Sequence, residues 1–365
     1  QQRREQVALC FVLIALVLTG GASSAWRLAC VALPLLMFQL PLGLTASAVV
    51  VVLIPSSLEM LIYGNWVGSL GGRIALVASV LVLASSVALG LRLNQSRPLR
   101  HALATAMPYL AVALMVQALI RLGDLVPPDW QYLSGNHLSA LILFAFVPAL
   151  GLRLSPTARW VTIVALCFGL VLTGSRWGIW IGVVFVLLMV TIVVKNKWRY
   201  FFSVALAAAL LVPWFLLSTL DISKAGLVRA LARIYTLRPW TGLGPGGAEQ
   251  VSLQFVERTA RLTHIESIAF DWSATFGVPF SCLLFAALIL LVFAKKSKSS
   301  GGTVDRLRVL AAVCVVGLLC HDLFDFSLYS GAVRLGIGCC IGLLIPTSIN
   351  TLKTPRKMAM GAAFL

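Results

Sequence analysis

The sequence predicts an all-α polytopic membrane protein with about twelve transmembrane helices and one large loop outside the membrane. Its residues are 60% hydrophobic and 11% charged, and its mean hydropathy is +0.97. Soluble domains carry about 25% charged residues. Segments of roughly 20 apolar residues, the length that crosses a bilayer, recur along the whole chain. One polar stretch, residues 220–266, interrupts this pattern.

The apolar segments predict a single membrane domain over residues 1–365. Helices are expected because backbone groups in lipid need partners within the segment. The join near Thr45 carries no charge, so eleven or thirteen helices remain alternatives. The predicted spans are 6–24, 27–44, 45–63, 74–92, 102–121, 137–153, 158–174, 177–194, 199–219, 267–294, 307–325 and 332–350.

The basic residues predict the orientation, because cytoplasmic segments are enriched in Lys and Arg. With both termini in the cytoplasm, 18 of the 29 Lys and Arg fall on that side and loop 220–266 faces outward. The opposite orientation would translocate every basic cluster. The 18 residues are Arg3, Arg4, Arg92, Arg97, Arg100, Arg153, Arg159, Lys195, Lys197, Arg199, Lys295, Lys296, Lys298, Arg306, Arg308, Lys353, Arg356 and Lys357.

This topology accounts for the formal net charge of +17 without a nucleic-acid partner. The cytoplasmic positives are expected to attract anionic membrane lipid. The four histidines are far apart and no Cys-x-x-Cys occurs, so no metal site is predicted. The eight cysteines fall within predicted spans and are interpreted as small packing residues.

Loop 220–266 is far longer than a turn between two spans requires. Spacings of three to four residues predict an amphipathic helix over 227–237. Its basic face is expected either to contact lipid headgroups or to form one wall of an anionic substrate pocket. The candidate cations are Lys224, Arg229, Arg233 and Arg238.

A glycine turn, residues 242–247, follows these cations. Gly242 and Gly244 allow backbone to approach a ligand closely, although no Gly-Lys-Ser/Thr follows and the turn is not a P-loop. His264 ends the loop, with Glu266 two residues later. Histidine is suited to proton abstraction near neutral pH, and the alternative is a residue that caps the helix or contacts headgroups.

Three further outward-facing patches hold polar residues. Asn136 and His137 open a predicted span, either as caps or as substrate contacts. Arg176 lies in the tight turn 173–178, where it either snorkels or binds phosphate bidentately. Near the C-terminus, an ion pair of Asp325 with Arg334 is a sufficient structural explanation for acids at membrane depth.

In this order, the patches resemble the O-antigen ligase and polymerase family of bacterial inner-membrane glycan-assembly proteins. The resemblance covers about residues 130–335. Its motifs are Asn136-His137, Thr173-Gly174-Ser175-Arg176, Arg238-Pro239-Trp240-Thr241-Gly242-Leu243-Gly244-Pro245-Gly246, His264, and His321-Asp322-Leu323-Phe324-Asp325-Phe326.

The resemblance implies a metal-independent glycosyltransferase without a cofactor. It would transfer a glycan from undecaprenyl diphosphate to a lipid A-core or similar acceptor at the periplasmic face. Arg176 and a loop cation, Arg229 or Lys224, would bind the diphosphate, and His264 would activate the acceptor hydroxyl. Family members often have Asn after this histidine, whereas this chain has Ile265 followed by Glu266.

Three other functions remain open, and one of them is a membrane scaffold in which loop 220–266 binds a partner protein. A repeat-unit polymerase shares the ligase architecture, and the sequence only slightly favours the ligase. A lipid-linked glycan transporter is expected to show internal repeats and polar residues at mid-membrane. Here the polar residues gather at one face, which favours an enzyme. The partners expected on this reading are the lipid-linked glycan donor, the lipid or glycan acceptor, and membrane lipid.

Overall fold

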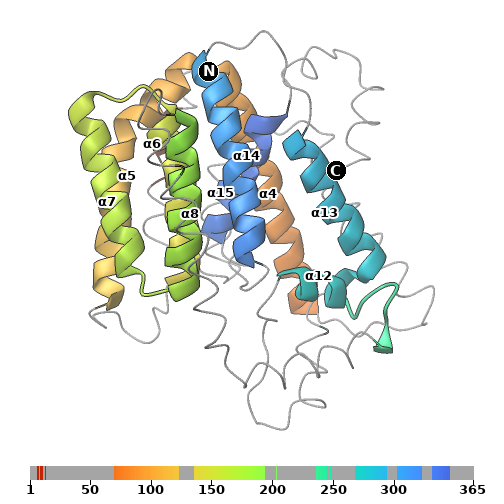
Figure 1. Ribbon diagram of the computed structural model, residues 1–365. Helices are drawn as coiled ribbons and strands as arrows, with labels where there is room; N and C mark the ends of the chain where they lie inside the picture. Colours follow the sequence, from red (N-terminus) through yellow and green to blue (C-terminus); the bar gives the residue numbers. More distant parts are fainter. Residues whose placement is uncertain are drawn as a thin grey trace.

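The computed structural model describes residues 70–122, 135–193, 236–244, 268–293, 302–322 and 331–345, with the single residues 6, 7, 9, 10, 13, 203 and 247. This part of the chain is helical and contains no strand, which confirms the all-α prediction (Figure 1). The helices are α4 (Leu70–Gln95), α5 (Arg97–Leu122), α6 (Gly135–Gly151), α7 (Pro156–Leu172), α8 (Arg176–Val193), α12 (Ile268–Phe276), α13 (Val278–Phe293), α14 (Gly302–Asp322) and α15 (Gly331–Leu344).

Most of these helices coincide with predicted spans, to within a few residues at each end. The predicted span 267–294 is the exception, because the chain breaks at Gly277 into α12 and α13. The predicted spans 27–44, 45–63 and 199–219 lie outside the described residues, apart from residue 203. Of span 6–24, only five residues are described.

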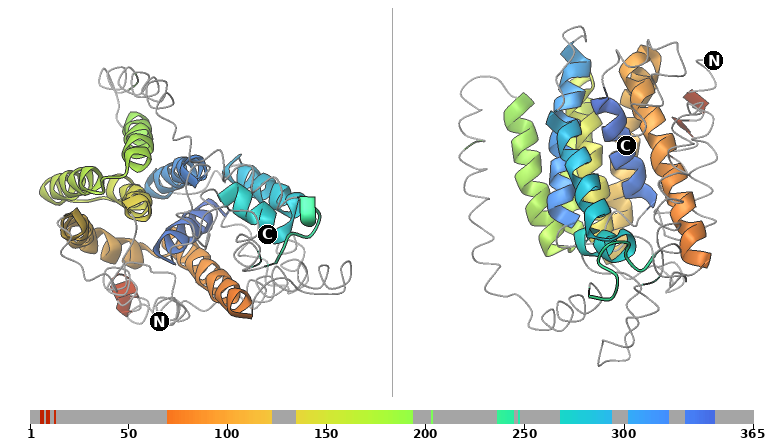
Figure 2. Two further views of the ribbon diagram at one scale, coloured as in Figure 1. Left: turned by 90° about the horizontal axis from the view of Figure 1, so that it is seen from below. Right: turned by 90° about the vertical axis from the view of Figure 1, so that its right-hand side faces the viewer.

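Helix α6 is the centre of the bundle. It contacts α5, α7, α8, α14 and α15, and nearly all its side chains from Leu138 to Leu150 are buried (Figure 2). A helix that is apolar on every face is stable only when surrounded by protein or lipid. The apolar sequence of α6 therefore reflects its central position.

Small residues bring α4 and α15 into close contact. Gly90 of α4 lies against the backbone of Cys339 and Gly342, and Gly338 lies against Ser86. Glycine and serine four residues apart let two helix backbones approach without intervening side chains. This seam defines the position of α15 beside α4.

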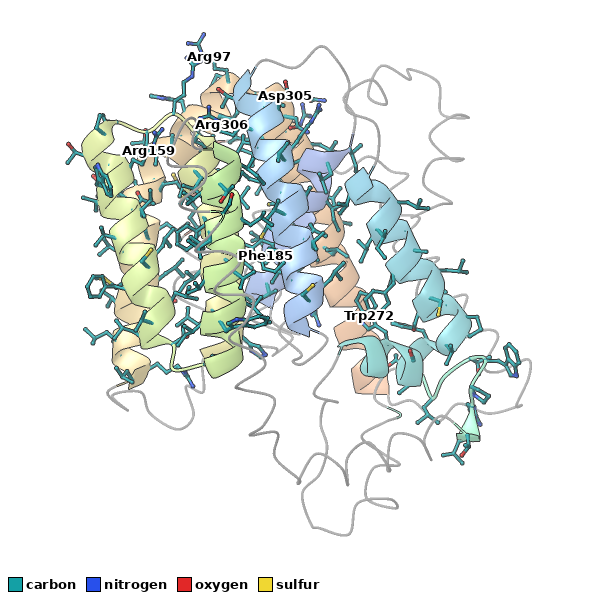
Figure 3. All side chains as sticks on the ribbon, in the orientation of Figure 1. Arg97, Arg159, Phe185, Trp272, Asp305 and Arg306 are labelled. Atoms are coloured by element: carbon teal, nitrogen blue, oxygen red, sulfur yellow. The ribbon has the colours of Figure 1, made fainter. Side chains whose placement is uncertain are left out.

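The bundle has one end rich in arginine, called here the basic end and defined by Arg97, Arg159 and Arg306. Figure 3 shows these residues with Asp305 at one end, and Trp272 toward the other. Two further arginines cap helix C-termini there: Arg100 Nη1 donates to Leu93 O at 2.7 Å, and Arg308 Nε donates to Leu343 O at 3.2 Å. Cationic groups are favourable at the negative end of a helix dipole.

Among the described residues, α5 is the one helix that is long and apolar enough to cross a membrane. Five shorter apolar helical segments, of 10–17 residues, accompany it. The prediction of about twelve spans thus extends beyond what the described helices establish.

Candidate functional site

The turn between α7 and α8 lies at the end of the bundle opposite the basic end (Figures 1 and 3). It consists of Thr173, Gly174 and Ser175, as tight as the sequence predicts. Thr173 is the C-cap of α7, and its Oγ1 donates to Leu170 O at 2.7 Å. Gly174 has φ +66°, a left-handed backbone conformation that residues other than Gly, Asn and Asp rarely adopt. The glycine therefore allows the chain to reverse immediately after α7.

Ser175 starts the next helix. Its Oγ accepts a hydrogen bond from Gly178 N at 2.9 Å, the usual geometry of an N-terminal serine cap. Arg176 is the first residue of α8, and its side chain lies outside the described part. Arg176 therefore begins a helix that Ser175 caps, immediately after the glycine at which the chain reverses direction.

The start of α6 packs against this turn. A Cβ atom on Gly135 would overlap both the Thr173 carbonyl oxygen and Arg121 Nη1, so only glycine fits there. One turn further into the two helices, Gly178 lies directly against the Ser139 hydroxyl. The start of α6 from residue 135 and the segment 173–178, more than 30 residues apart in the sequence, are thus joined in one cluster.

Asn136 and His137 lie within the first turn of α6. His137 is half-buried, with its Nε2 atom fully buried, whereas the side chain of Asn136 is outside the described part. Three hydroxyl residues in the same region, Ser139, Thr173 and Ser175, are also buried. The cluster therefore places several hydroxyl groups next to the helix start that carries Arg176, at the end of α6 where Asn136 and His137 lie.

Arg121 belongs to this cluster although the sequence patterns did not single it out. It lies near the end of α5, and its Nη1 donates a hydrogen bond to Thr173 O. The signal that could have found it is the one that drew attention to Arg176, a cation at the outer end of a span. Its partner, 52 residues away, could not be read from the sequence.

The glycine turn of the large loop is docked on the break between α12 and α13. Leu243 N donates to Ala274 O at 2.6 Å, and Gly244 N donates to Thr275 O at 3.1 Å. The last carbonyls of a helix have no partner within it. Loop amides supply those partners here, which is why α12 can end inside the protein.

The close backbone approach that the sequence predicts at this turn is an approach to a helix. Gly242 (φ +70°) lies against the Thr275 carbonyl, and Gly277 (φ +83°) lies against the Trp240 backbone. Val278 N donates to Pro239 O at 3.0 Å across the same junction. The amides of Gly242 and Gly244 donate to carbonyls of the protein itself. Contact of these glycines with substrate remains a prediction.

Alanine substitution should separate the two roles of positive-φ glycines. At Gly174 nothing lies within 4 Å of an added Cβ, so Gly174→Ala should cost only the backbone strain, roughly 1–2 kcal/mol. At Gly277 an added Cβ would also overlap the Trp240 carbonyl. Thermal unfolding in detergent should therefore show a larger fall in melting temperature for Gly277→Ala. Equal shifts for the two variants would contradict the docking of the glycine turn.

The remaining predicted site residues divide into two groups. Arg238 is described, half-buried, at the start of the docked turn, and its carbonyl accepts from Gly242 N at 2.9 Å. Arg334 lies in the first turn of α15, but Asp325 is outside the described residues. Five further predicted site residues also lie outside the described part: Lys224, Arg229, Arg233, His264 and Glu266.

Within the described ranges, no three His, Cys, Asp or Glu side chains lie close enough together to hold a metal ion. Comparison of the chain with known protein families, with characterised proteins and with solved structures finds no match.

Proposed function

We propose that this protein is a multi-pass glycosyltransferase of the bacterial inner membrane. It transfers a glycan from undecaprenyl diphosphate to a lipid A-core or similar acceptor at the periplasmic face. One observation carries the proposal: the turn that leads into Arg176 packs against the helix start that bears Asn136 and His137. These are the first two motifs of the resemblance, and they meet at the end of the bundle away from the basic end.

The surface of the bundle supports a membrane environment. Helix α7 exposes Trp160, Val164, Phe168 and Val171, which follow one another at helical spacing along one face. The neighbouring helix α5 exposes a similar row, Tyr109, Val112, Val116 and Leu119. Soluble monomers rarely expose apolar patches of this extent, whereas lipid covers such rows.

The gathering of arginines supports the proposed orientation. Arg97, Arg159 and Arg306 come from three separate segments and lie at one end (Figure 3). The positive-inside rule assigns that end to the cytoplasm. The candidate site then lies toward the periplasm, where lipid-linked glycans are used without nucleotide sugars.

The proposed chemistry is a displacement at the anomeric carbon of the donor sugar. The acceptor hydroxyl oxygen forms a bond to that carbon, and the bond from the carbon to the diphosphate oxygen breaks. The hydroxyl proton passes to His264, and the diphosphate leaves with the bonding electron pair. Arg176, together with Arg229 or Lys224, stabilises the negative charge on the leaving group. A diphosphate is a good leaving group, so oriented cations and one base are sufficient.

The other substrate contacts in this proposal come from the same segments. Asn136 and His137 would contact donor or acceptor beside Arg176, while Glu266 would contact the acceptor beside His264. Arg233, Arg238, Gly242 and Gly244 would form the loop side of the site. A repeat-unit polymerase would use the same groups with a growing glycan as its acceptor.

The test is a gel of surface glycans from cells lacking the protein and complemented with variants. Arg176→Ala should reduce transfer by roughly 10- to 100-fold, because it removes hydrogen bonds to a charged group. Arg176→Lys should restore only part, since lysine lacks the planar fork. Arg97→Ala, which changes an exposed arginine at the basic end, serves as the control.

The glycan pattern also distinguishes the two transferases. Acceptor lipid without glycan in the null strain and in Arg176→Ala indicates a ligase, and acceptor carrying one repeat unit indicates a polymerase. A null strain with unchanged glycans would refute the proposal.

A further inference from the structure

Arg121 joins three segments of the candidate site. Its side chain extends from the end of α5, is largely exposed, and donates from Nη1 to the Thr173 carbonyl. That carbonyl belongs to the C-cap of α7 and, like other carbonyls at a helix end, has no acceptor role within its own helix. A cation is the favoured partner at this position.

The packing of Gly135 shows that the position of this guanidinium is specific. A Cβ atom at Gly135 would overlap Nη1 and would lie 3.1 Å from Cζ of Arg121. The guanidinium therefore lies against the first residue of α6 and the last residue of the α7 cap at once. A larger residue at 135 would push it away from Thr173.

The hydrogen bond from Arg121 to Thr173 is important because of the residue that follows Thr173. Gly174 has a positive φ and nothing within 4 Å of its Cβ position, so side-chain packing does not restrain it. Arg176 follows two residues later, on the helix that Ser175 caps. The Arg121 hydrogen bond thus restrains the turn on one side, and the Ser175 cap restrains it on the other.

We propose that Arg121 is a positioning residue for the diphosphate-binding turn. By fixing the Thr173 carbonyl against the start of α6, it orients Arg176 toward the lipid-linked diphosphate. This inference rests on the proposed transferase function. It predicts that Arg121 acts through Arg176 and does not contact the donor itself.

The first test is a double-mutant cycle on the full-length protein in lipid vesicles. Arg121→Met keeps most of the side-chain length but cannot donate, and should raise KM for the undecaprenyl-diphosphate-linked donor about 10-fold, with kcat little changed. Gly135→Ala, which keeps the arginine but displaces its guanidinium from Thr173, should raise KM similarly. Arg121→Lys should restore part of the affinity, and Arg97→Met is the matched control.

The cycle closes with Arg176→Ala. If Arg121 acts through Arg176, then adding Arg121→Met to Arg176→Ala should raise KM no further. Two independent, multiplying effects on KM would overturn the proposal, because Arg121 would then contact the substrate directly.

Hydrogen exchange separates this inference from the proposed function. Amides of residues 174–179 should exchange about 10-fold faster in Arg121→Met than in wild type, with unchanged exchange in α4 and α15, because local opening depends on local restraints. Unchanged exchange in the turn would overturn the inference whatever the transfer assay gives. If wild type transfers no glycan, the proposed function fails, and the exchange result alone decides whether Arg121 fixes the turn.

Discussion

Replacing His264 by alanine is expected to lower kcat for glycan transfer by about 10²- to 10⁴-fold, the usual contribution of a general base. The acceptor hydroxyl must lose its proton as its oxygen attacks the anomeric carbon, and no other histidine falls within loop 220–266. Donor KM should change little, because the diphosphate is bound by cations. The measurement is steady-state transfer in vesicles with saturating acceptor.

His101→Ala is the matched control for this prediction. His101 is exposed and lies near the start of α5, far along that helix from Arg121. Its removal should leave kcat within about twofold, since exposed substitutions distant from a site have small effects. A His264→Ala enzyme with normal kcat would remove His264 as the base, while Arg176 could still bind the diphosphate.

In the part of the chain that the structure describes, hydropathy predicted the helices well, and the one clear error there has a physical cause. The segment 267–294 is mostly apolar, with Asp271 as its one charged residue, so hydropathy predicts one helix. The break at Gly277 depends on the backbone of Trp240 and Pro239, which lie more than 30 residues earlier in the chain. These contacts are tertiary, but Gly277 followed by Pro279 is a local signal of a helix end that hydropathy alone does not detect.

The candidate site, too, was predictable from the sequence only in part. The tight turn was predictable because two apolar spans meet with few residues between them, and a glycine is needed to reverse the chain. The contact of this turn with Gly135 was not predictable, since it depends on which helices are neighbours. Arg121 was missed for that reason: its significance lies in its partner, the Thr173 carbonyl.

The glycine turn, residues 242–247, has the close backbone approach that the sequence predicts, but the contact is with the protein itself. Its glycines do allow a close backbone approach, as the sequence suggests. The backbone that approaches is that of the α12–α13 break, so the glycines fix part of the large loop to the bundle. Arg238, at the start of this turn, is held against the bundle in the same way.

The second large effect is expected at the seam between α4 and α15, from Gly342→Val. A Cβ atom at Gly342 would overlap the Val87 carbonyl and would lie 2.9 Å from the Gly90 Cα. Both are backbone atoms, so no rotamer change relieves the overlap and the two helices must separate. Overpacking of this kind typically costs about 1–3 kcal/mol, and the upper end is expected where backbone cannot yield.

Separation of these helices would also disturb the end of α15. Asn94 Nδ2 donates to Gly342 O at 3.2 Å and to Leu343 O at 2.9 Å, and these hydrogen bonds depend on the same close approach. Gly342→Val should therefore lower the melting temperature in detergent by about 5 °C. Gly302→Ala is the matched control, because nothing lies within 4 Å of a Cβ at the start of α14. Equal melting temperatures for the two variants would mean that α4 and α15 do not meet through their glycines, and the arrangement of α15 beside α6 would then need revision.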